Sequence, residues 1–400
     1  MTPTQSDSRL ARLAQVAEDA ARHAPAFAAR LREAGLSPAD LAAPGGLDRL
    51  PVLKKERLMA LQAADPPFAG FLSCPIEDVD HIYVSPGPIF EPVLKGPGRG
   101  CGFDLMFRAA GIGPGDIALN TWNYHLVPAG LLFGQGARDA GASVIPSGPG
   151  QTDLQVQLMA SSGVTAFLGS TAYFETVADA FAETHGGTKG VWSLTRAFLG
   201  GEPGDWYGKR RRLEAAHGIT TYGCYGTADV GLVGFEEDDR PGYSVHPERL
   251  VQICDPETGK ALEPGVPGEI VVSTLARGWP MIRFGTGDLA RAETLAADGF
   301  VSRLGPVEGR VGAGVKVREI FIYPAHLVAL AARLDGVEAV RARITRQAGK
   351  DHIALEYHGA ALPDARIADA FQAVTRLRAD TVVRVETFTI ETEIDDARRF

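Results

Sequence analysis

Cysteine is scarce in this 400-residue sequence, and its four cysteines are widely spaced. Cys74, Cys101, Cys224 and Cys254 form no CxxC pair and no disulfide pattern, so free thiols in a reducing compartment are expected. The N-terminal segment lacks the apolar core of a signal peptide. No apolar run approaches the roughly 18 residues that a membrane span needs. These absences predict a cytoplasmic protein that has no membrane partner.

A surplus of basic charge is also absent, because 40 Lys and Arg residues stand against 49 Asp and Glu residues and the net charge is −9. Proteins that bind nucleic acid usually present a basic patch, so no nucleic-acid partner is expected. The densest basic run is Lys209–Arg212. A solvated helix face would account for this run, and a docking patch for a partner is the alternative.

The sequence has no repeat of solenoid length, and its 47 Gly and 26 Pro residues fall singly between periodic segments. Gly and Pro placed in this way mark turns, not low-complexity regions. The composition is 45% apolar and 22% charged, which is ordinary for a globular protein. A chain of this length predicts two or three domains.

The first half of the chain alternates between helical and strand-like patterns. An amphipathic helix is predicted over 8–24, and Pro25 should end or kink it. Further helices are predicted at 101–111, 125–140, 153–162 and 172–184, separated by short apolar runs at 116–120, 142–146, 166–169 and 196–200. This rhythm predicts βαβ units and an α/β fold with a parallel sheet. Such sheets bind ligands at the carboxyl ends of their strands.

Beyond residue 219 the pattern changes to strands separated by Gly and Pro turns. Strands predicted at 251–255, 268–274 and 281–284 indicate an antiparallel or barrel-like part. The glycine-dense segment 309–314 predicts a boundary, with a large domain over 1–309, a hinge over 310–314 and a small α+β domain over 315–400. The small domain has predicted helices at 325–335 and 364–377 and predicted strands at 338–345, 352–358 and 382–389.

Short motifs recur along nearly the whole chain in a fixed order. They are Pro51–Leu58, Ala110–Asp116, Gly141–Pro146, Gln155–Leu158, Gly200–Pro203, Tyr225–Asp229, Asp255–Gly259, Pro267–Val272, Ile282–Leu289 and Gly309–Arg310. In this order and at these intervals the sequence resembles the phenylacetate–CoA ligase family of adenylate-forming enzymes. Members of that family activate a carboxylate with ATP, which gives an acyl-adenylate and pyrophosphate. Their small domain then rotates, and the thiol of coenzyme A displaces AMP.

The resemblance implies a nucleotide site in the large domain. Asp288 matches the ribose-binding aspartate of the family, and a carboxylate can accept hydrogen bonds from both ribose hydroxyls. A turn aspartate is the alternative interpretation. Tyr225 and the segment Gly201, Glu202 and Pro203 match the two walls of the adenine pocket, where Gly201 and Glu202 also border the acyl group. A tyrosine that only fills the core is the alternative for Tyr225.

Other residues follow from the same resemblance. Gly226 lies in the adenine segment, and Asp229 could hold Mg²⁺ because it offers an oxygen ligand. Arg310 matches an arginine of the hinge region, although a surface ion pair is an equal alternative. Lys316 and Arg318 fall beside the expected channel for coenzyme A.

The family's acyl pocket aligns with Trp122, Asn123, Tyr124 and His125. An apolar pocket with aromatic walls and a few polar groups suits a planar acyl group, so an aromatic or otherwise bulky acyl substrate is expected. His125 is the catalytic candidate because a histidine can take a proton from an attacking thiol. The alternative is that His125 caps the helix that follows it.

The sequence departs from the family at the phosphate-binding loop. The corresponding segment is Ser85–Pro92, in which prolines replace backbone donors and both threonine hydroxyls are missing. Glu91 stands where a lysine would meet the β- and γ-phosphates, which reverses the charge at that point. Lys95 lies four residues further on and is a possible substitute.

Further departures follow at the other motifs. Ala228 replaces the threonine that would donate to the α-phosphate, and the hinge aspartate is lost within 312–314. Glu319 replaces a glycine beside the coenzyme A channel. Within 394–397, Asp396 stands where the family has its adenylation lysine, whose loss would cost a factor of about 10² to 10³.

Many family members hold a structural zinc ion with cysteines and a histidine. Here His246 could remain as a ligand, but 236–237 and 301–303 carry no thiolates. Zinc needs about four such ligands, so no metal site of this kind is predicted.

Three functional hypotheses remain open. The preferred one is acyl transfer from a coenzyme A thioester to a thiol acceptor such as an acyl carrier protein, without ATP, because thioester exchange needs only positioning and a proton acceptor. The second is an ordinary ATP- and Mg²⁺-dependent aryl-CoA ligase. The third is a binding protein without catalysis, since fold does not fix function. A homodimer is expected in each case.

Overall fold

The computed structural model describes residues 5–85, 87–96, 101–200, 206–237, 240–311, 314–318, 320–322, 324–347, 349–390 and 392–398. The chain divides into two compact units, Met1–Gly309 and Arg310–Phe400. Within the described residues, no helix combines the length and the apolar character that a membrane crossing requires.

One part of the large unit is built on a five-stranded parallel sheet. Its strand order is β5–β4–β6–β7–β8, and all of its pairings are parallel. The strands are β4 (Ile117–Asn120), β5 (Ser143–Pro146), β6 (Ala166–Ser170), β7 (Arg196–Gly200) and β8 (Thr220–Tyr222). The parallel sheet predicted from the alternating pattern is therefore present.

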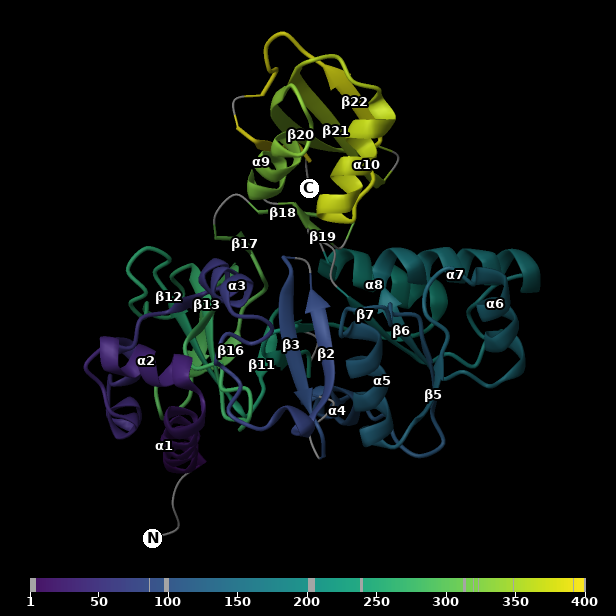
Figure 1. Cartoon of the computed structure of the whole chain (residues 1–400). Coiled ribbons are helices and arrows are strands. Elements are labelled where there is room, and N and C mark those ends of the chain that lie inside the picture. The colour runs from purple at the N-terminus through teal and green to yellow at the C-terminus, as the bar shows by residue number, and fades with distance from the viewer. Residues whose placement is uncertain are drawn as a thin grey trace. The chain divides into compact units, whose positions relative to one another are not determined.

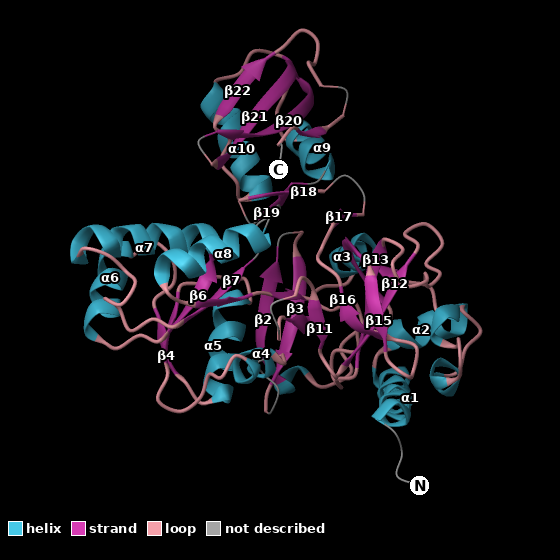
Figure 2. Ribbon diagram, turned by 180° about the vertical axis from the view of Figure 1, so that it is seen from behind, coloured by secondary structure: helices cyan, strands magenta, loops and turns pink. Residues whose placement is uncertain are grey.

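Helices accompany this sheet, as the connections between parallel strands require. They are α4 (Phe103–Ala109), α5 (Ala129–Ala140), α6 (Thr152–Ser161), α7 (Thr171–His185) and α8 (Trp206–His217). Figures 1 and 2 show α5 to α8 around the sheet. The predicted helices agree with α4 to α7 apart from their ends, but α5 begins four residues later than predicted, because 125–128 belongs to a loop.

A two-stranded antiparallel hairpin carries the segment that resembles the phosphate-binding loop. It pairs β2 (Val79–Ser85) with β3 (Ile89–Leu94), and Ser85 lies opposite Ile89 next to the turn. In both views the hairpin lies between the parallel sheet and the remaining strands of the large unit (Figures 1 and 2). The turn between β2 and β3 includes Pro86, which lies outside the described residues.

The remaining strands form two sheets that are largely antiparallel. One runs β1–β14–β13–β12, and the other runs β15–β16–β11–β10–β9. Their bounds are β1 (Leu53–Lys54), β9 (Cys224–Thr227), β10 (Gly231–Phe235), β11 (Tyr243–Val245), β12 (Arg249–Cys254), β13 (Gly268–Thr274), β14 (Phe284–Ala290), β15 (Ala292–Leu295) and β16 (Val301–Leu304). The short strand β17 (Gly309–Arg310) follows them.

The strand predicted over 281–284 is wrong, since β14 begins only at Phe284. The preceding residue, Arg283, has a left-handed backbone with φ 56°, which interrupts an extended strand. Its guanidinium group is buried and donates to the carbonyl oxygens of Asp48 and Leu50 at 2.5 and 2.6 Å. Arg283 thus fastens an N-terminal segment to the sheet and does not continue the strand.

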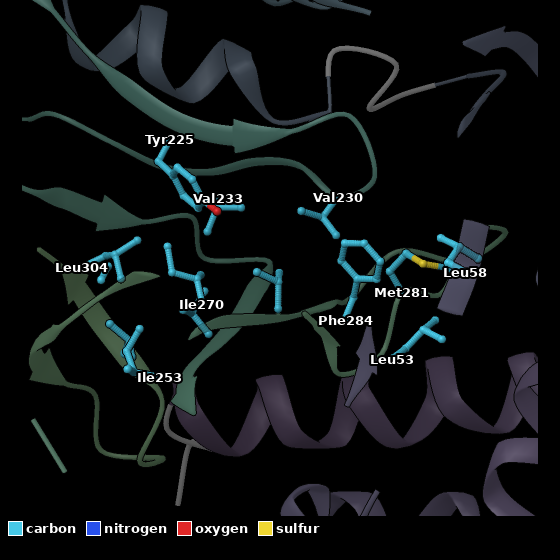
Figure 3. Close-up of a cluster of buried hydrophobic side chains, with 14 of the residues drawn as sticks. Leu53, Leu58, Tyr225, Val230, Val233, Ile253, Ile270, Met281, Phe284 and Leu304 are labelled. Atoms are coloured by element: carbon cyan, nitrogen blue, oxygen red, sulfur yellow. The ribbon is translucent and has the colours of Figure 1, made fainter. Parts of the chain in front are cut away.

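A hydrophobic cluster joins the two antiparallel sheets to the helix α3 (Lys55–Ala64) (Figure 3). Leu53 and Leu58 on either side of the helix start pack with Met281 and Phe284. Tyr225 belongs to the same cluster and is 7% exposed. This packing fixes the start of α3 against the strand that carries Asp288.

The N-terminal helices α1 (Gln5–His23) and α2 (Pro25–Glu33) cover a separate cluster. Pro25 ends α1 as predicted and begins α2, where proline needs no hydrogen-bond partner for its nitrogen. Three short 3₁₀ helices follow in the large unit, at Pro38–Ala42, Leu47–Arg49 and Ile76–Asp78. The cluster includes Leu250, Ile282 and Phe300, so the first helices pack on residues that come late in the sequence.

The C-terminal unit has its own sheet and core. Its four-stranded sheet runs β22–β21–β20–β23, and β18 pairs with β19. The elements are β18 (Val315–Val317), β19 (Ile320–Ile322), α9 (Pro324–Ala332), β20 (Val337–Gln347), β21 (Lys350–Gly359), α10 (Asp364–Thr375), β22 (Thr381–Arg384) and β23 (Ile394–Asp396). The strand predicted over 382–389 ends at Arg384, and the amide of Thr389 donates to the Glu356 carboxylate at 3.0 Å instead of to a neighbouring strand.

Candidate functional site

Two residues expected at the nucleotide lie together in the large unit. Tyr225 on β9 donates its hydroxyl to Oδ2 of Asp288 on β14 at 2.9 Å. The two side chains are 63 positions apart in the sequence, and both residues are less than one-tenth exposed. The phenol ring belongs to the core while its hydroxyl meets a carboxylate. The pair thus has a structural role, and its role in binding a nucleotide stays a prediction.

Asp229 follows β9 in a turn and is only 2% exposed. Its Oδ2 lies 3.0 Å from Nζ of Lys55, the first residue of α3. Its Oδ1 is buried and has no hydrogen-bond partner in the described part of the chain. A buried carboxylate oxygen without a partner is unusual, and it fits a ligand for Mg²⁺, which is bound through one or two carboxylates together with phosphate oxygens.

The hairpin segment is organised around Glu91, which is 1% exposed. Its Oε1 accepts a hydrogen bond from the Ser85 hydroxyl, and its Oε2 accepts from the Ser85 amide at 3.3 Å. Burial and the negative charge of Asp229 raise the pKa of Glu91 to about 8, while the charge of Lys55 opposes this shift. Glu91 therefore holds a proton near neutral pH, and the charge reversal expected at this position is largely suppressed.

Lys95 cannot replace the lysine of the family's phosphate loop. It follows β3 at the end where Val79 pairs with Leu94, the opposite end of the hairpin from the turn. Its Nζ donates to the carbonyl oxygen of Glu77 at 2.5 Å on the exposed side. The cation next to the hairpin carboxylate is Lys55 instead.

Trp122 follows β4 and packs against the end of β7. A Cβ atom on Gly200 would come within 2.2 Å of the Trp122 ring, and the Trp122 and Phe133 ring centroids are 5.5 Å apart. Nε1 of Trp122 is buried and has no hydrogen-bond partner among the described residues. The glycine at position 200 thus makes room for the indole at the carboxyl end of the parallel sheet.

Tyr124 is held by the loop between β4 and α5. Its hydroxyl accepts a hydrogen bond from Nδ2 of Asn120 at 2.8 Å, and its ring would clash with any Cβ on Gly130. Asn120 also donates to the carbonyl oxygen of Gly130 at 2.7 Å. Because Asn120 is fully buried at the end of a strand, it fixes the aromatic segment in place.

Asn123 and His125 are exposed. Oδ1 of Asn123 accepts from the backbone amide of His125 at 2.8 Å and lies 3.0 Å from its Nδ1. The interpretation of His125 as a helix cap is wrong, because α5 begins at Ala129 with Pro128 in the cap position. An exposed ring is available to exchange a proton, so His125 stays a candidate without a demonstrated target.

Several predicted ligand residues have a structural explanation or cannot be placed. Gly201, Glu202 and Pro203 lie outside the described residues. Gly226 is needed for packing, since a Cβ there would come within 2.7 Å of the Gly231 carbonyl oxygen. Glu319 and 312–313 also lie outside the described residues.

In the C-terminal unit, Lys316 lies on β18 and Arg310 on β17. Arg318 has φ 46°, and its guanidinium group donates to the carbonyl oxygens of Asp351 and Arg378 and pairs with Asp380. Most of its donors are thus engaged within that unit.

The lysine expected near the C-terminus of the family is an aspartate with a partner of its own. Oδ1 and Oδ2 of Asp396 on β23 accept hydrogen bonds from Nε and Nη2 of Arg398 at 2.7 and 2.6 Å. Arg398 also lies 3.0 Å from Asp351 on β21, so Asp396 has a structural use in the C-terminal unit.

Glu236 stands where the resemblance would place a zinc ligand. Its Oε1 accepts from Trp206 and Tyr207 at 3.2 and 3.0 Å, and its Oε2 accepts from Arg210 and the Gly223 amide at 3.3 and 2.6 Å. Four donors occupy a carboxylate that is 1% exposed. Among the residues that the structure describes, no three Cys, His, Asp or Glu side chains gather as a metal site would require.

The basic run Lys209–Arg212 is not simply a solvated face. Lys209 pairs with Glu175 at 2.8 Å, and Arg210 is buried with Glu214 and Glu236. Two of the four cations are thus used inside the large unit. This arrangement weakens the hypothesis that the run docks a partner.

Three features of the site region were not predicted from the sequence: the roles of Lys55 and Gln62, and the hydrogen bonds between Ser85 and Glu91. Gln62 on α3 forms two hydrogen bonds with the backbone of Phe90, both 2.9 Å long. A lysine and a glutamine on a helix are ordinary in sequence, so no local signal marked them. The motif Pro51–Leu58 did contain Lys55.

No model of a known protein family matches the chain. The phenylacetate–coenzyme A ligase of Thermus thermophilus is 28% identical over 323 residues, which cover 76% of this chain and 70% of that protein. The phenylacetate–coenzyme A ligases of Pseudomonas putida and Escherichia coli are also 28% identical, over 334 and 335 residues. These alignments cover 80% and 79% of this chain and 73% of each relative.

Solved structures with the same fold include a 2-hydroxyisobutyryl-CoA ligase. In its thioesterification state, with 2-HIB-AMP and CoA, it matches with a TM-score of 0.88 and 24% identity over 99% of this chain and 91% of that one. Its postadenylation state with 2-HIB-AMP matches with a TM-score of 0.70 and 25% identity over 97% of this chain and 89% of that one. The order of the motifs, the fold and these relatives agree: the chain is a phenylacetate–CoA ligase-like member of the adenylate-forming acyl-CoA ligase superfamily.

Proposed function

We propose that the protein is an acid–thiol ligase that uses ATP to join a carboxylic acid to coenzyme A. The observation that carries this proposal is the Tyr225–Asp288 pair, in which the nucleotide-binding tyrosine and aspartate expected from the family meet at 2.9 Å. The curated relatives, which are phenylacetate–coenzyme A ligases, support the same activity. This proposal reverses the order of the hypotheses drawn from the sequence, where transfer without ATP came first.

The residues of the large unit have distinct tasks in this reaction. Asp288 would accept from ribose hydroxyls, and Tyr225 holds that carboxylate in orientation. Asp229 would hold Mg²⁺, which when bound neutralises charge on the phosphate oxygens. Trp122 and Tyr124 would position the acyl group, because their rings are fixed by Gly200, Asn120 and Gly130.

A second function, acyl transfer from a coenzyme A thioester without ATP, is favoured by a separate observation. Carboxylates occupy both positions where the family has lysines: Glu91 is buried in the hairpin, and Asp396 is paired with Arg398. Removing a cation from a developing phosphate charge typically costs several kcal/mol. An acceptor such as an acyl carrier protein would then take the acyl group, with His125 as proton acceptor.

Pyrophosphate release tests the proposal. The purified protein is given ATP, Mg²⁺ and a panel of aryl acids and short hydroxy acids, and release is compared with a control without acid. We expect release with at least one acid, a loss of at least tenfold in Asp288→Ala, and no loss in Asp255→Ala, a variant at an exposed turn carboxylate that belongs to no proposed site.

The outcomes separate the hypotheses. The absence of acid-dependent release with every acid would contradict the ligase proposal. In that case the same preparation receives aryl-CoA thioesters and a thiol acceptor, and transfer would establish the second function. If neither reaction occurs, the hypothesis of a non-catalytic binding protein remains.

A further inference from the structure

A phosphate site needs positive charge, and the hairpin that resembles the phosphate loop does not supply it. Glu91 replaces the family's lysine, and Lys95 is bound to Glu77 at the far end of the hairpin. Backbone donors alone are weak here, because two residues of the turn segment are prolines. A cation for this site must therefore come from another element.

Helix α3 lies against the hairpin turn. A Cβ on Gly87 would come within 3.1 Å of Cε of Met59, and Gln62 is hydrogen-bonded to Phe90 on β3. Lys55 lies four residues before Met59, so the two side chains share one face of the helix. The first turn of α3 thus faces the residues that resemble the phosphate loop.

Lys55 places its ammonium group in the interior at this point. Its side chain is 17% exposed, and Nζ lies 3.0 Å from Oδ2 of Asp229, whose side chain is 1% exposed. Lys55 also acts on Glu91, since its charge lowers the pKa of that carboxyl group. The ammonium group of Lys55 thus interacts electrostatically with two buried carboxyl groups, those of Asp229 and Glu91.

The Lys55–Asp229 pair is incomplete as a purely structural ion pair. Oδ1 of Asp229 is buried without a hydrogen-bond partner among the described residues. The remaining lone pairs of a buried ion pair need partners. The open oxygen therefore calls for a donor or a cation, such as the Mg²⁺ that accompanies a polyphosphate.

We propose that Lys55 is the cation that binds the polyphosphate of the nucleotide, and that Asp229 holds its ammonium group in position before the nucleotide arrives. This inference rests on the proposed function. Lys55 lies 36 positions before Glu91 in the sequence and would supply the positive charge that Glu91 cannot provide. Arrival of an anion lets Nζ share its three donors between Asp229 and phosphate oxygens.

Lys54 provides a matched control, because it is the neighbouring lysine and also pairs with a buried carboxylate. Its ammonium group contacts Glu269, whose side chain is 2% exposed, and it has no place in the proposed site. Lys55→Met and Lys54→Met therefore remove equivalent charges from adjacent positions. The double variant Lys55→Met/Asp229→Asn removes both partners, so that no buried charge is left unpaired.

The test measures binding of ATP, inorganic pyrophosphate and coenzyme A to the full chain by calorimetry, with circular dichroism as a check of folding. We expect Lys55→Met to weaken ATP and pyrophosphate binding at least tenfold, Lys55→Arg to retain most of the affinity, and Lys54→Met to change it less than twofold. If Lys55→Met fails to fold, the double variant is compared with Asp229→Asn alone, and it should bind ATP and pyrophosphate at least tenfold more weakly than that single variant.

Each outcome has a definite meaning. Equal ATP affinities of Lys55→Met and Lys54→Met, in a protein that releases pyrophosphate, would overturn the inference and leave the ligase proposal intact. Loss of coenzyme A binding alone would also overturn it, because the cation would then serve the diphosphate of coenzyme A. Lys55-dependent ATP binding without pyrophosphate release would support the inference while contradicting the ligase proposal. A wild-type chain that binds neither ATP nor pyrophosphate overturns the inference.

Discussion

Tyr225 is an example of a residue whose ring and hydroxyl have separate surroundings. The ring packs with Val230, Val233 and Leu304 in the hydrophobic cluster (Figure 3). The hydroxyl donates to Asp288. A buried tyrosine hydroxyl normally has such a partner, so the bond contributes to stability as well as to the proposed nucleotide site.

The substitution Tyr225→Phe separates the two contributions. It keeps the ring and removes the donor, so the free energy of unfolding should fall by only about 0.5–1.5 kcal/mol. Nucleotide affinity should fall more than threefold, because Asp288 loses the group that orients it. Tyr243→Phe, whose ring lies 6.3 Å away, should leave the affinity unchanged. Isothermal titration and urea unfolding of both variants check this, and equal affinities would contradict a role in the site.

His246 makes the large unit sensitive to acid. It is 3% exposed, and its Nδ1 accepts from the amide of Glu248 at 3.0 Å. Burial, together with the charges of Arg249 and Arg12, lowers its pKa from 6.5 to about 3. Below pH 6.5 His246 therefore binds a proton in the unfolded chain but not in the folded chain. The free energy of unfolding falls as the pH drops from 6.5 towards 3.

The substitution His246→Asn should remove this loss of stability in acid, while the asparagine side chain keeps an acceptor for the backbone amide of Glu248. Unfolding in urea at several pH values should show a decline between pH 6.5 and 4 that is shallower by about 1.4 kcal/mol per pH unit. The variant should be less stable at pH 7.5, because Asn leaves a cavity. His23→Asn, at an exposed helix position, is the control, and an unchanged slope in His246→Asn would disprove the assignment.

At the scale of elements, the hairpin β2–β3 depends on helix α3 for its position. A two-stranded hairpin is marginally stable by itself. Gln62 is fully buried and completes the hydrogen bonds of Phe90 on the outer side of β3. The side-chain amide thus acts as a short additional strand beside the hairpin.

Gln62→Leu tests this attachment. Both backbone groups of Phe90 would lose their partners, at about 1–3 kcal/mol each. We expect a loss of roughly 2–5 kcal/mol in the free energy of unfolding and faster hydrogen exchange of the β3 amides. Gln157→Leu on the exposed face of α6 should change neither. Unchanged exchange in β3 would show that other contacts hold the hairpin.

The order of elements could be predicted where the sequence is periodic. Helices and strands between 101 and 200 follow from alternating apolar runs, and their parallel pairing follows from the βαβ rhythm. The strand at 281–284 could not be placed correctly, because Arg283 has a left-handed backbone fixed by contacts to Asp48 and Leu50. Those contacts span more than two hundred positions and leave no local pattern.

The candidate site could be predicted only where its residues lie in sequence motifs of the family. Tyr225 and Asp288 each lie in a recognisable string, so their meeting followed from the resemblance. The Lys55–Asp229 pair joins residues 174 positions apart, and a lysine at a helix start is unremarkable by itself. The negative charge of Glu91 was expected to repel phosphate. Its raised pKa depends first on burial, which cannot be read from the sequence.

At the scale of the whole molecule, the two units have separate hydrophobic cores. The cluster of the C-terminal unit contains residues between Val315 and Ile394 only, and the other clusters lie before residue 310. A unit that buries its own core can fold independently.

A fragment of residues 310–400 should therefore fold without the rest of the chain. We expect a single cooperative thermal transition and dispersed amide resonances. Phe371→Ala, which removes a fully buried ring, should lower its stability by about 3–5 kcal/mol and serves as the control for cooperativity. A fragment that shows no transition would mean that its core needs the large unit.

The shortest strand of the large unit has a consequence for protein synthesis. Leu53 and Lys54 of β1 pair in parallel with Phe284 and Gly285 of β14, and the first two helices pack on Phe300. At about 5–20 residues per second, a ribosome needs roughly 12 to 50 s to make the intervening 250 residues. Throughout that interval the N-terminal cluster lacks Leu250, Leu275, Ile282 and Phe300. The apolar face that these four residues will cover is thus exposed on the nascent chain until they have been made.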